Sequence, residues 1–337
     1  MRPKQVKEAI KVNLSCNINT LLVGAPAIGK TQVAEQTAME YCAEHGGAYM
    51  VLHPVCDDPA DWKGLGFPSS DKTSAAFLPY GNLLTMINAT APLIVIIDDV
   101  GQAMISVQAA LMQVLEHRSI NGKHISEHCR FILCTNRRGD KAGVSGIIEP
   151  LKSRCLPINF DVNGDDWRLW ANQNGLPVEL IAFSKLRENL LFDFAPTTDI
   201  TNSSSPRGFA RVGKLQNAGI PKSIEFEMYQ GCVGAKAATE YVAFLDRFRS
   251  MPNPEKYIKN PDNEPLPTEE SILYALAAAL SGMANKTNLE AIYKVAMRLD
   301  AEFSTFMVFS MIQRDKKLSQ NVHMAEWAKK YATYLLD

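Results

Sequence analysis

Residues 24–31 have the residue types and the spacing that bind a polyphosphate. Their sequence, Gly-Ala-Pro-Ala-Ile-Gly-Lys-Thr, fits the pattern G-x-x-x-x-G-K-[ST] at every fixed position. The two glycines let the backbone curl so that its N–H groups point at a phosphate, the lysine reaches the β- and γ-phosphates, and the threonine hydroxyl binds Mg²⁺. The residues that we expect to bind the nucleotide are Gly24, Ala25, Pro26, Ala27, Ile28, Gly29, Lys30, Thr31, Gln32 and Asp98, with Thr31 and Asp98 as the Mg²⁺ ligands.

Carboxylate and amide side chains follow two further apolar runs. Asp98 and Asp99 end the run 93–97, and Asn136 ends the run 131–135. Parallel α/β sheets place their chemistry at the carboxyl ends of the strands, so we expect these side chains beside the phosphate loop. Asp98 would bind Mg²⁺ through water, Asp99 would polarise the attacking water, and Asn136 would position that water or contact the γ-phosphate. The structural alternatives are a helix N-cap or a solvated carboxylate for Asp99 and a turn residue for Asn136.

The segments around these residues alternate between strand and helix patterns. Buried strands are predicted at 20–23, 48–52, 93–97, 131–135 and 156–160, and helices at 3–12, 30–44, 82–88 and 107–117. Strands that alternate with helices after a phosphate loop predict an α/β fold with the parallel sheet of a P-loop NTPase. Residues 64–81 predict an exposed hairpin-like insertion, and the Asn-Gly pair at 121–122 predicts a second hairpin.

From residue 165 onward the pattern becomes helical. The predicted helices lie at 167–174, 178–189, 223–230, 235–249, 269–284, 287–313 and 321–336, with another starting at 203–207 and a break expected within 287–313. Five prolines between residues 251 and 267 predict a linker. We therefore predict a nucleotide-binding core at 1–162, a helical lid at 163–250, this linker at 251–267, and a C-terminal helical region at 268–337.

The composition bounds the class of protein. A chain of 337 residues is long enough for two or three domains, and a formal net charge of −1 gives no general attraction to nucleic acid or to anionic membranes. Seven cysteines without a C-x-x-C pair indicate reduced thiols, not a disulfide framework or a zinc site. No signal peptide is apparent, and no apolar stretch is long enough to span a bilayer. We expect a cytoplasmic protein without a membrane partner.

The motifs together resemble those of an AAA+ ATPase and, within that superfamily, those of the MoxR branch. The resemblance covers about residues 15–215, and residues 216–337 carry no motif that we can place. The similar segments are 24–31 (Walker A), 94–99 (Walker B), 134–136 (sensor 1), 149–154 (the segment ending in the arginine finger) and 205–207 (sensor 2).

This resemblance implies Mg²⁺-dependent ATP hydrolysis by a homo-oligomeric ring, usually a hexamer, with ATP held between neighbouring subunits. It implies catalytic roles for Asp99, Asn136, Arg154 and Arg207. Arg154 of one subunit would reach the γ-phosphate bound by the next, and Arg207 would report the nucleotide state from the lid. The family also implies a chaperone that remodels a protein partner, often one with a von Willebrand A-like domain. Two insertions, 64–80 and 119–128, would face the pore of the ring.

Two positions depart from the family pattern. Asp99 stands where the family usually has Glu, and Ser153 stands where an Asp often precedes the finger arginine. The Asp99 carboxylate is one methylene shorter and is expected to hold the attacking water less well, so the sequence does not predict whether hydrolysis is fast. Because Ser153 weakens the match at Arg154, Arg137 and Arg138 are the other candidates for an arginine contact across a subunit interface.

Two other functions therefore stand beside the remodelling of a protein partner. One is a nucleic-acid motor or loader, which Lys123, His124 and His128 in the second hairpin favour although the net charge does not. The other is a slow, nucleotide-dependent assembly scaffold, which Asp99 favours. A small-molecule kinase is disfavoured, because it has no use for sensor and finger motifs.

Overall fold

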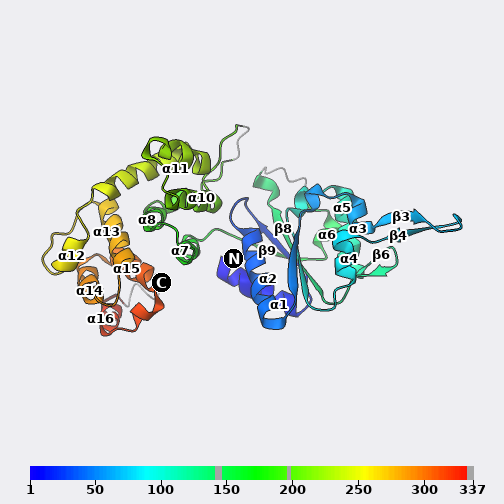
Figure 1. Cartoon of the computed structure of the whole chain (residues 1–337), viewed down its shortest axis with the longest axis horizontal. Helices are drawn as coiled ribbons and strands as arrows, with labels where there is room; N and C mark the ends of the chain where they lie inside the picture. Colours follow the sequence, from blue (N-terminus) through cyan, green and yellow to red (C-terminus); the bar gives the residue numbers. More distant parts are fainter. Residues whose placement is uncertain (141–145, 196–198, 332–337) are drawn as a thin grey trace. The chain divides into compact units, whose positions relative to one another are not determined.

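The structure is a computed structural model, and it describes residues 1–140, 146–195 and 199–331. The chain divides into two compact units, Met1–Val162 and Asn163–Asp337 (Figure 1). Among the described residues, none of the helices combines the length and the apolar composition that crossing a bilayer requires.

A five-stranded parallel sheet forms the centre of the first unit. Its strands are β1 (Thr20–Gly24), β2 (Ala48–Leu52), β5 (Leu93–Ile97), β8 (Cys129–Asn136) and β9 (Leu156–Asn159), in the order β2-β5-β8-β1-β9. Every pairing is parallel, so the carboxyl ends of all strands lie at one edge of the sheet. The loop 24–31 leaves this edge between β1 and the following helix. The predicted P-loop NTPase fold is thereby confirmed.

Helices cover both faces of this sheet. They are α1 (Pro3–Ser15), α2 (Lys30–His45), α3 (Pro59–Lys63), α4 (Gly81–Ile87), α5 (Ile105–His117) and α6 (Glu149–Lys152). The apolar face of α5 packs on β5 in a core cluster that also holds Leu151 of α6 and Trp62 of α3. Helices α1 and α2 pack together, and Lys7 and Lys11 of the first form ion pairs with Glu40 and Glu44 of the second at 2.8 Å each. The helices predicted in this half of the chain are present, with ends that differ by a few residues.

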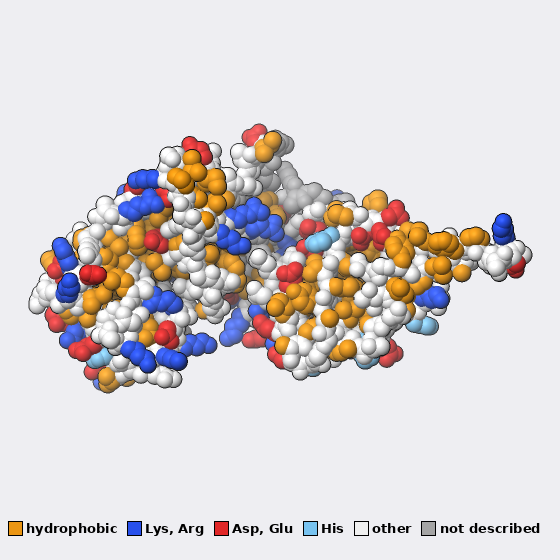
Figure 2. Space-filling view, in the orientation of Figure 1, with side chains coloured by type: hydrophobic (Ala, Val, Ile, Leu, Met, Phe, Trp, Pro, Cys, Tyr) orange, Lys and Arg blue, Asp and Glu red, His pale blue; other side chains and the backbone are white. Residues whose placement is uncertain are grey.

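Two hairpins extend from the first unit, as the sequence predicts. Strands β3 (Leu65–Pro68) and β4 (Ala75–Leu78) pair antiparallel in a ribbon that projects away from the sheet (Figure 1). All of their residues are exposed, and hydrophobic side chains follow the ribbon in Figure 2. Strands β6 (Ser119–Ile120) and β7 (Lys123–His124) join at Asn121 and Gly122, whose φ values of 46° and 74° are typical of an Asn-Gly hairpin turn.

The described part of the second unit is helical. Its helices are α7 (Gly164–Gln173), α8 (Val178–Leu186), α9 (Glu188–Leu191), α10 (Pro206–Asn217), α11 (Glu225–Ser250), α12 (Glu255–Lys259), α13 (Glu270–Met283), α14 (Leu289–Arg298), α15 (Ala301–Arg314) and α16 (Val322–Tyr331). The two helices predicted at 223–230 and 235–249 form α11, in which Gly234, with φ 78°, makes a non-helical kink between them. The break expected within 287–313 separates α14 from α15.

Some helix predictions in this unit need correction. The helix predicted at 178–189 ends at Leu186, and the separate short helix α9 follows it. The segment predicted to be only a linker contains α12, whose Tyr257 side chain is buried and donates a hydrogen bond to the Pro265 carbonyl at 3.0 Å. Of the helix predicted at 321–336, residues 332–336 lie outside the described residues.

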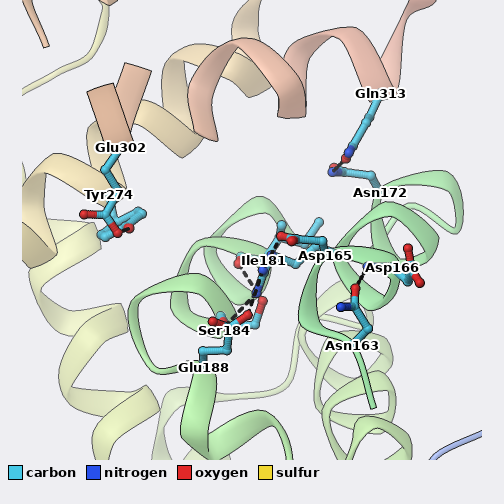
Figure 3. A network of polar contacts seen from close by, with 11 residues as sticks. Asn163, Asp165, Asp166, Asn172, Ile181, Ser184, Glu188, Tyr274, Glu302 and Gln313 are labelled. Carbon is cyan, nitrogen blue, oxygen red and sulfur yellow. Dashed lines mark hydrogen bonds and ion pairs between the residues drawn. The ribbon is translucent and has the colours of Figure 1, made fainter. Parts of the chain in front are cut away.

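Polar contacts join the helices predicted as lid to those predicted as a C-terminal region (Figure 3). The guanidinium of Arg168 in α7 is buried and forms ion pairs with Asp165 at 2.5 Å and Glu188 at 3.0 Å. Contacts between the two predicted regions include the hydrogen bond from Asn172 Nδ2 to Gln313 Oε1 at 2.9 Å and the ion pair of Arg247 with Glu269 at 2.9 Å. Within the predicted C-terminal region, Tyr274 Oη donates to Glu302 Oε1 at 2.5 Å. Helix α13 packs on α8 and α15, and α15 packs on α7. The two predicted regions thus share one packed unit.

Candidate nucleotide-binding site

The backbone of the loop 24–31 requires glycine at both ends. Gly29 has φ 98°, a left-handed conformation, and forms the N-cap of α2. A Cβ atom on Gly24 would lie 2.6 Å from the Phe160 carbonyl oxygen and 2.8 Å from Ile28 Cδ1. The first N–H groups of α2 have no partner within the helix and carry its positive dipole end. The loop and this helix terminus together form a cradle for an anion.

The Lys30 side chain lies within the curve of the loop. It is 6% exposed, and its Nζ donates to the Ala25 carbonyl at 2.7 Å, to the Gly24 carbonyl at 3.1 Å and to Asn136 Oδ1 at 2.7 Å. These acceptors are neutral. A phosphate oxygen is a stronger partner for an ammonium group, because the hydrogen bond is then charge-assisted on both sides. Lys30 is therefore placed to bind a phosphate that enters the loop.

Thr31 and Asp98 lie together at the base of the loop. Thr31 Oγ1 donates to Asp98 Oδ2 at 2.8 Å, and Asp98 Oδ1 accepts the Asp99 N–H at 3.0 Å. The described residues contain no group of three or more His, Cys, Asp or Glu side chains that could hold a metal ion. Mg²⁺ bound with a nucleotide uses only one or two protein oxygens together with water and phosphate oxygens. A hydroxyl and a carboxylate in contact fit that chemistry.

Asp99 and Asn136 complete the cluster. Asp99 begins the turn after β5 with φ 52°, a left-handed conformation that is uncommon for residues other than glycine. Asn136 Nδ2 lies 3.4 Å from Asp99 Oδ1, while Asn136 Oδ1 accepts from Lys30. The amide therefore bridges the lysine and the second carboxylate. The structure brings together Lys30, Thr31, Asp98, Asp99 and Asn136, as the strand ends predict.

Two other residues near the cluster do not join it. Gln32 lies in the first turn of α2 and is exposed. Cys134 in β8 is fully buried, and burial raises the pKa of its thiol well above the usual range.

Arg154 lies at the opposite edge of the sheet from the phosphate loop. It precedes β9, whose first residue, Leu156, pairs with Thr20 at the amino end of β1. The length of β1, five residues at about 3.3 Å per step, separates the two edges by about 13 Å. Arg154 Nε forms an ion pair with Glu116 Oε2 at 3.0 Å, and its carbonyl accepts from Asn19 Nδ2 at 3.0 Å. The structure therefore does not bring Arg154 to the loop of its own chain.

The other candidate arginines occupy different places. Arg137 follows Asn136 directly, at the same edge as the loop, and forms an ion pair with Asp161 at 2.5 Å. The hydrogen bond from Arg137 lowers the pKa of the Asp161 carboxyl. Arg138 is exposed. Arg207 belongs to the second unit, where it is exposed in the first turn of α10 after the N-cap Ser205, whose Oγ accepts the Gly208 N–H at 3.2 Å.

Sequence reasoning missed the partners of these arginines and one buried amide. Glu116 and Asp161 carry no motif, and no local pattern links them to Arg154 and Arg137. Gln108 of α5 is fully buried and bonded to two loops. A signal for it existed, because Gln108 lies between Val107 and Leu111 on the apolar side of a helical pattern.

Comparisons with known proteins add little to this geometry. No protein-family model and no curated protein sequence matches the chain. Among the similar solved structures is NtrX from Brucella abortus, which is 14% identical over 94% of this chain and 67% of that chain, with a TM-score of 0.39. The Thermotoga maritima RuvB Holliday junction branch migration motor is 15% identical over 88% of this chain and 87% of that chain, with a TM-score of 0.39. PCH-2 from C. elegans is 13% identical over 72% of this chain and 69% of that chain, with a TM-score of 0.39. Values this low assign neither a family nor a function to the chain.

Proposed function

We propose that this protein is an AAA+ ATPase, similar to the MoxR branch, that hydrolyses ATP with Mg²⁺ as a homo-oligomeric ring, with a hexamer as the expected size. The observation that carries the proposal is the convergence of Lys30, Thr31, Asp98, Asp99 and Asn136 at one edge of the sheet. An isolated glycine-rich turn would not require a carboxylate pair and an amide from two other strands.

Each of these residues has a task that its contacts support. The loop would wrap the triphosphate, with Lys30 exchanging its neutral acceptors for β- and γ-phosphate oxygens. Thr31 and Asp98 would hold Mg²⁺, which when bound neutralises charge on the phosphates. Asp99 would accept a proton of the attacking water, and Asn136, within reach of both Lys30 and Asp99, would orient that water toward the γ-phosphate.

The position of Arg154 supports a ring. A guanidinium can offer two parallel hydrogen bonds to phosphate oxygens and so stabilise charge in the transition state. Since the sheet separates Arg154 from the loop of its own chain, that contact would require a neighbouring subunit. Arg207 would add a second cation from the helical unit.

The exposed ribbon β3–β4 favours a protein partner over nucleic acid. Four large apolar side chains on it are 46–49% exposed: Leu65, Phe67, Phe77 and Leu78. Apolar side chains rimmed by polar groups suit protein contacts, whereas nucleic acid calls for cations. A von Willebrand A-like domain is one candidate partner. Lys123 and His124, exposed in β7, keep a nucleic-acid motor as the second candidate.

One assay tests the ATPase and a second separates the candidates. Steady-state release of phosphate with ATP and Mg²⁺ should be present in the wild type and absent in Lys30→Ala, while the variant Lys4→Ala, on the exposed side of α1, should match the wild type. Stimulation of that rate by a co-purifying protein, and not by DNA, would support remodelling. A wild type that binds ATP but does not turn it over would indicate the scaffold function instead.

A further inference from the structure

A buried amide on α5 links the two halves of the proposed catalytic machinery. Gln108 is 0% exposed. Its Nε2 donates to the Ala103 carbonyl at 3.1 Å and to the Gly146 carbonyl at 3.1 Å, and its Oε1 accepts the Ile148 N–H at 3.0 Å. Both amide hydrogens and the carbonyl oxygen are therefore used, in a site where an unmade hydrogen bond is costly.

The first segment that Gln108 holds is the turn that carries Asp99. In this turn the Gln102 N–H donates to the Asp99 carbonyl at 2.9 Å, and the Ala103 N–H donates to the Val100 carbonyl at 3.2 Å. Asp99 itself has a left-handed backbone at the start of the turn. Because such a conformation persists only where its surroundings hold it, the bond from Gln108 to the last residue of the turn supports the orientation of the Asp99 carboxylate.

The second segment leads to Arg154. The Ile148 carbonyl accepts the N–H groups of Leu151 and Lys152 at 3.0 and 3.1 Å, and so forms the first turn of α6. The Arg154 N–H then donates to the Leu151 carbonyl at 3.2 Å. The place of Ile148 therefore sets the place of α6 and of the arginine that follows it. A further bond, from Gly146 N–H to the Gly101 carbonyl at 3.3 Å, joins the two segments directly.

Helix α5 supports both ends of the second segment. Gln108 holds residues 146–148 near the start of the helix, and Glu116, eight residues or about 12 Å further along it, pairs with Arg154. The helix begins directly after the Asp99 turn. A continuous set of hydrogen bonds therefore connects that turn with the segment 146–154.

We propose that Gln108 is a positioning residue that couples the Asp99 turn in the nucleotide site of one subunit to the Arg154 that this subunit presents to its neighbour. The inference rests on the ring ATPase proposed above. It adds that one side chain sets the geometry of catalysis in two sites, its own through Asp99 and the adjacent one through Arg154.

Mixed rings separate these two effects. The donor subunit carries Lys30→Ala, so its nucleotide site is inactive but its Arg154 is intact. The acceptor subunit carries Arg154→Ala, so its nucleotide site is intact but it has no finger. ATP is therefore hydrolysed only at an interface where the nucleotide site of an acceptor meets the Arg154 of a donor. Gln108→Met, which keeps the length of the side chain and removes its hydrogen bonds, is placed in the donor alone or in the acceptor alone. Gln113→Met, on the exposed face of the same helix, is the matched control.

We expect Gln108→Met to lower complementation by about 10-fold or more from either side, because small displacements of catalytic groups cost up to about 100-fold in rate. The KM for ATP should stay within about twofold, and Gln113→Met should have no effect. Normal complementation by a Gln108→Met donor would overturn the coupling to Arg154, and a normal acceptor would overturn the coupling to Asp99.

Failure of the ring proposal has a different signature. If the donor and the acceptor without any change at position 108 form no mixed rings, the ring proposal fails. If mixed rings form but do not complement, Arg154 is not the finger, and in either case the coupling is rejected as well. If Gln108→Met does not fold, the same mixtures are made with Gln108→Asn, whose amide is one methylene too short to reach both segments. The same reduction from either side is expected, and full complementation rejects the coupling.

Discussion

Replacing Arg154 by alanine tests the ring most directly. The variant loses an intrachain ion pair, which affects stability little, and the proposed contact with the neighbour's γ-phosphate, which should affect kcat strongly. Within one chain, Arg154 forms an ion pair with Glu116, whose side chain is 47% exposed. Such an exposed pair contributes about 0.2–1 kcal/mol to stability, so the loss should lower the Tm by at most about 4 °C. An arginine finger contributes about 10³–10⁵-fold to kcat, or at least about 4 kcal/mol of transition-state stabilisation. The expected result is a nearly inactive protein that is almost as stable as the wild type.

The assay combines three measurements on the same preparations. Phosphate release gives kcat and KM, calorimetry gives the affinity for ATP, and thermal unfolding gives the Tm. We expect Arg154→Ala to bind ATP normally. Its activity per subunit should stay low at all protein concentrations, whereas that of the wild type should rise with concentration as rings assemble.

Glu116→Gln is the matched variant, because it removes the same ion pair and leaves the arginine. It should lower the Tm as much as Arg154→Ala but reduce kcat by less than about 10-fold. Equal losses of kcat in the two variants would show that the intrachain ion pair matters and that Arg154 is no finger. Activity in Arg154→Ala within about 10-fold of the wild type would also refute the reasoning, and Arg137→Ala would then be assayed as the rival.

Three further predictions concern the site and the second unit. Lys30→Ala should lose tight ATP binding, since it removes the cation within the loop, and unchanged affinity in calorimetry would contradict the site. Asp99→Asn should bind ATP and hydrolyse it at least about 100-fold more slowly, whereas Asp98→Asn should also weaken Mg²⁺-dependent binding; equal turnover in Asp99→Asn and the wild type would make Asp99 structural. A chain that ends at residue 252 should lose the cooperative unfolding of the second unit, because α7 and α8 lose α13 and α15 from their surfaces. Circular dichroism on heating checks this, and an unchanged transition would show that the C-terminal helices are dispensable for folding.

The amino-acid sequence by itself determined which residues form the candidate nucleotide-binding site. The loop 24–31 is contiguous, and its glycines, lysine and threonine act through local backbone geometry that the pattern specifies. Asp98, Asp99 and Asn136 could be assigned to the same site because they stand at the ends of two apolar runs. Parallel strands bring such ends to one edge whatever their order in the sheet.

Only the tertiary structure decided which distant parts of the chain contact one another. The pairing of Arg154 with Glu116, the burial of Gln108 between two loops and the packing of α13 on α8 join residues that are far apart in the chain. Hydrophobic periodicity reports which face of an element is buried, but not which element covers it. The partners of a polar side chain depend on that second choice, which the packing of the whole unit makes.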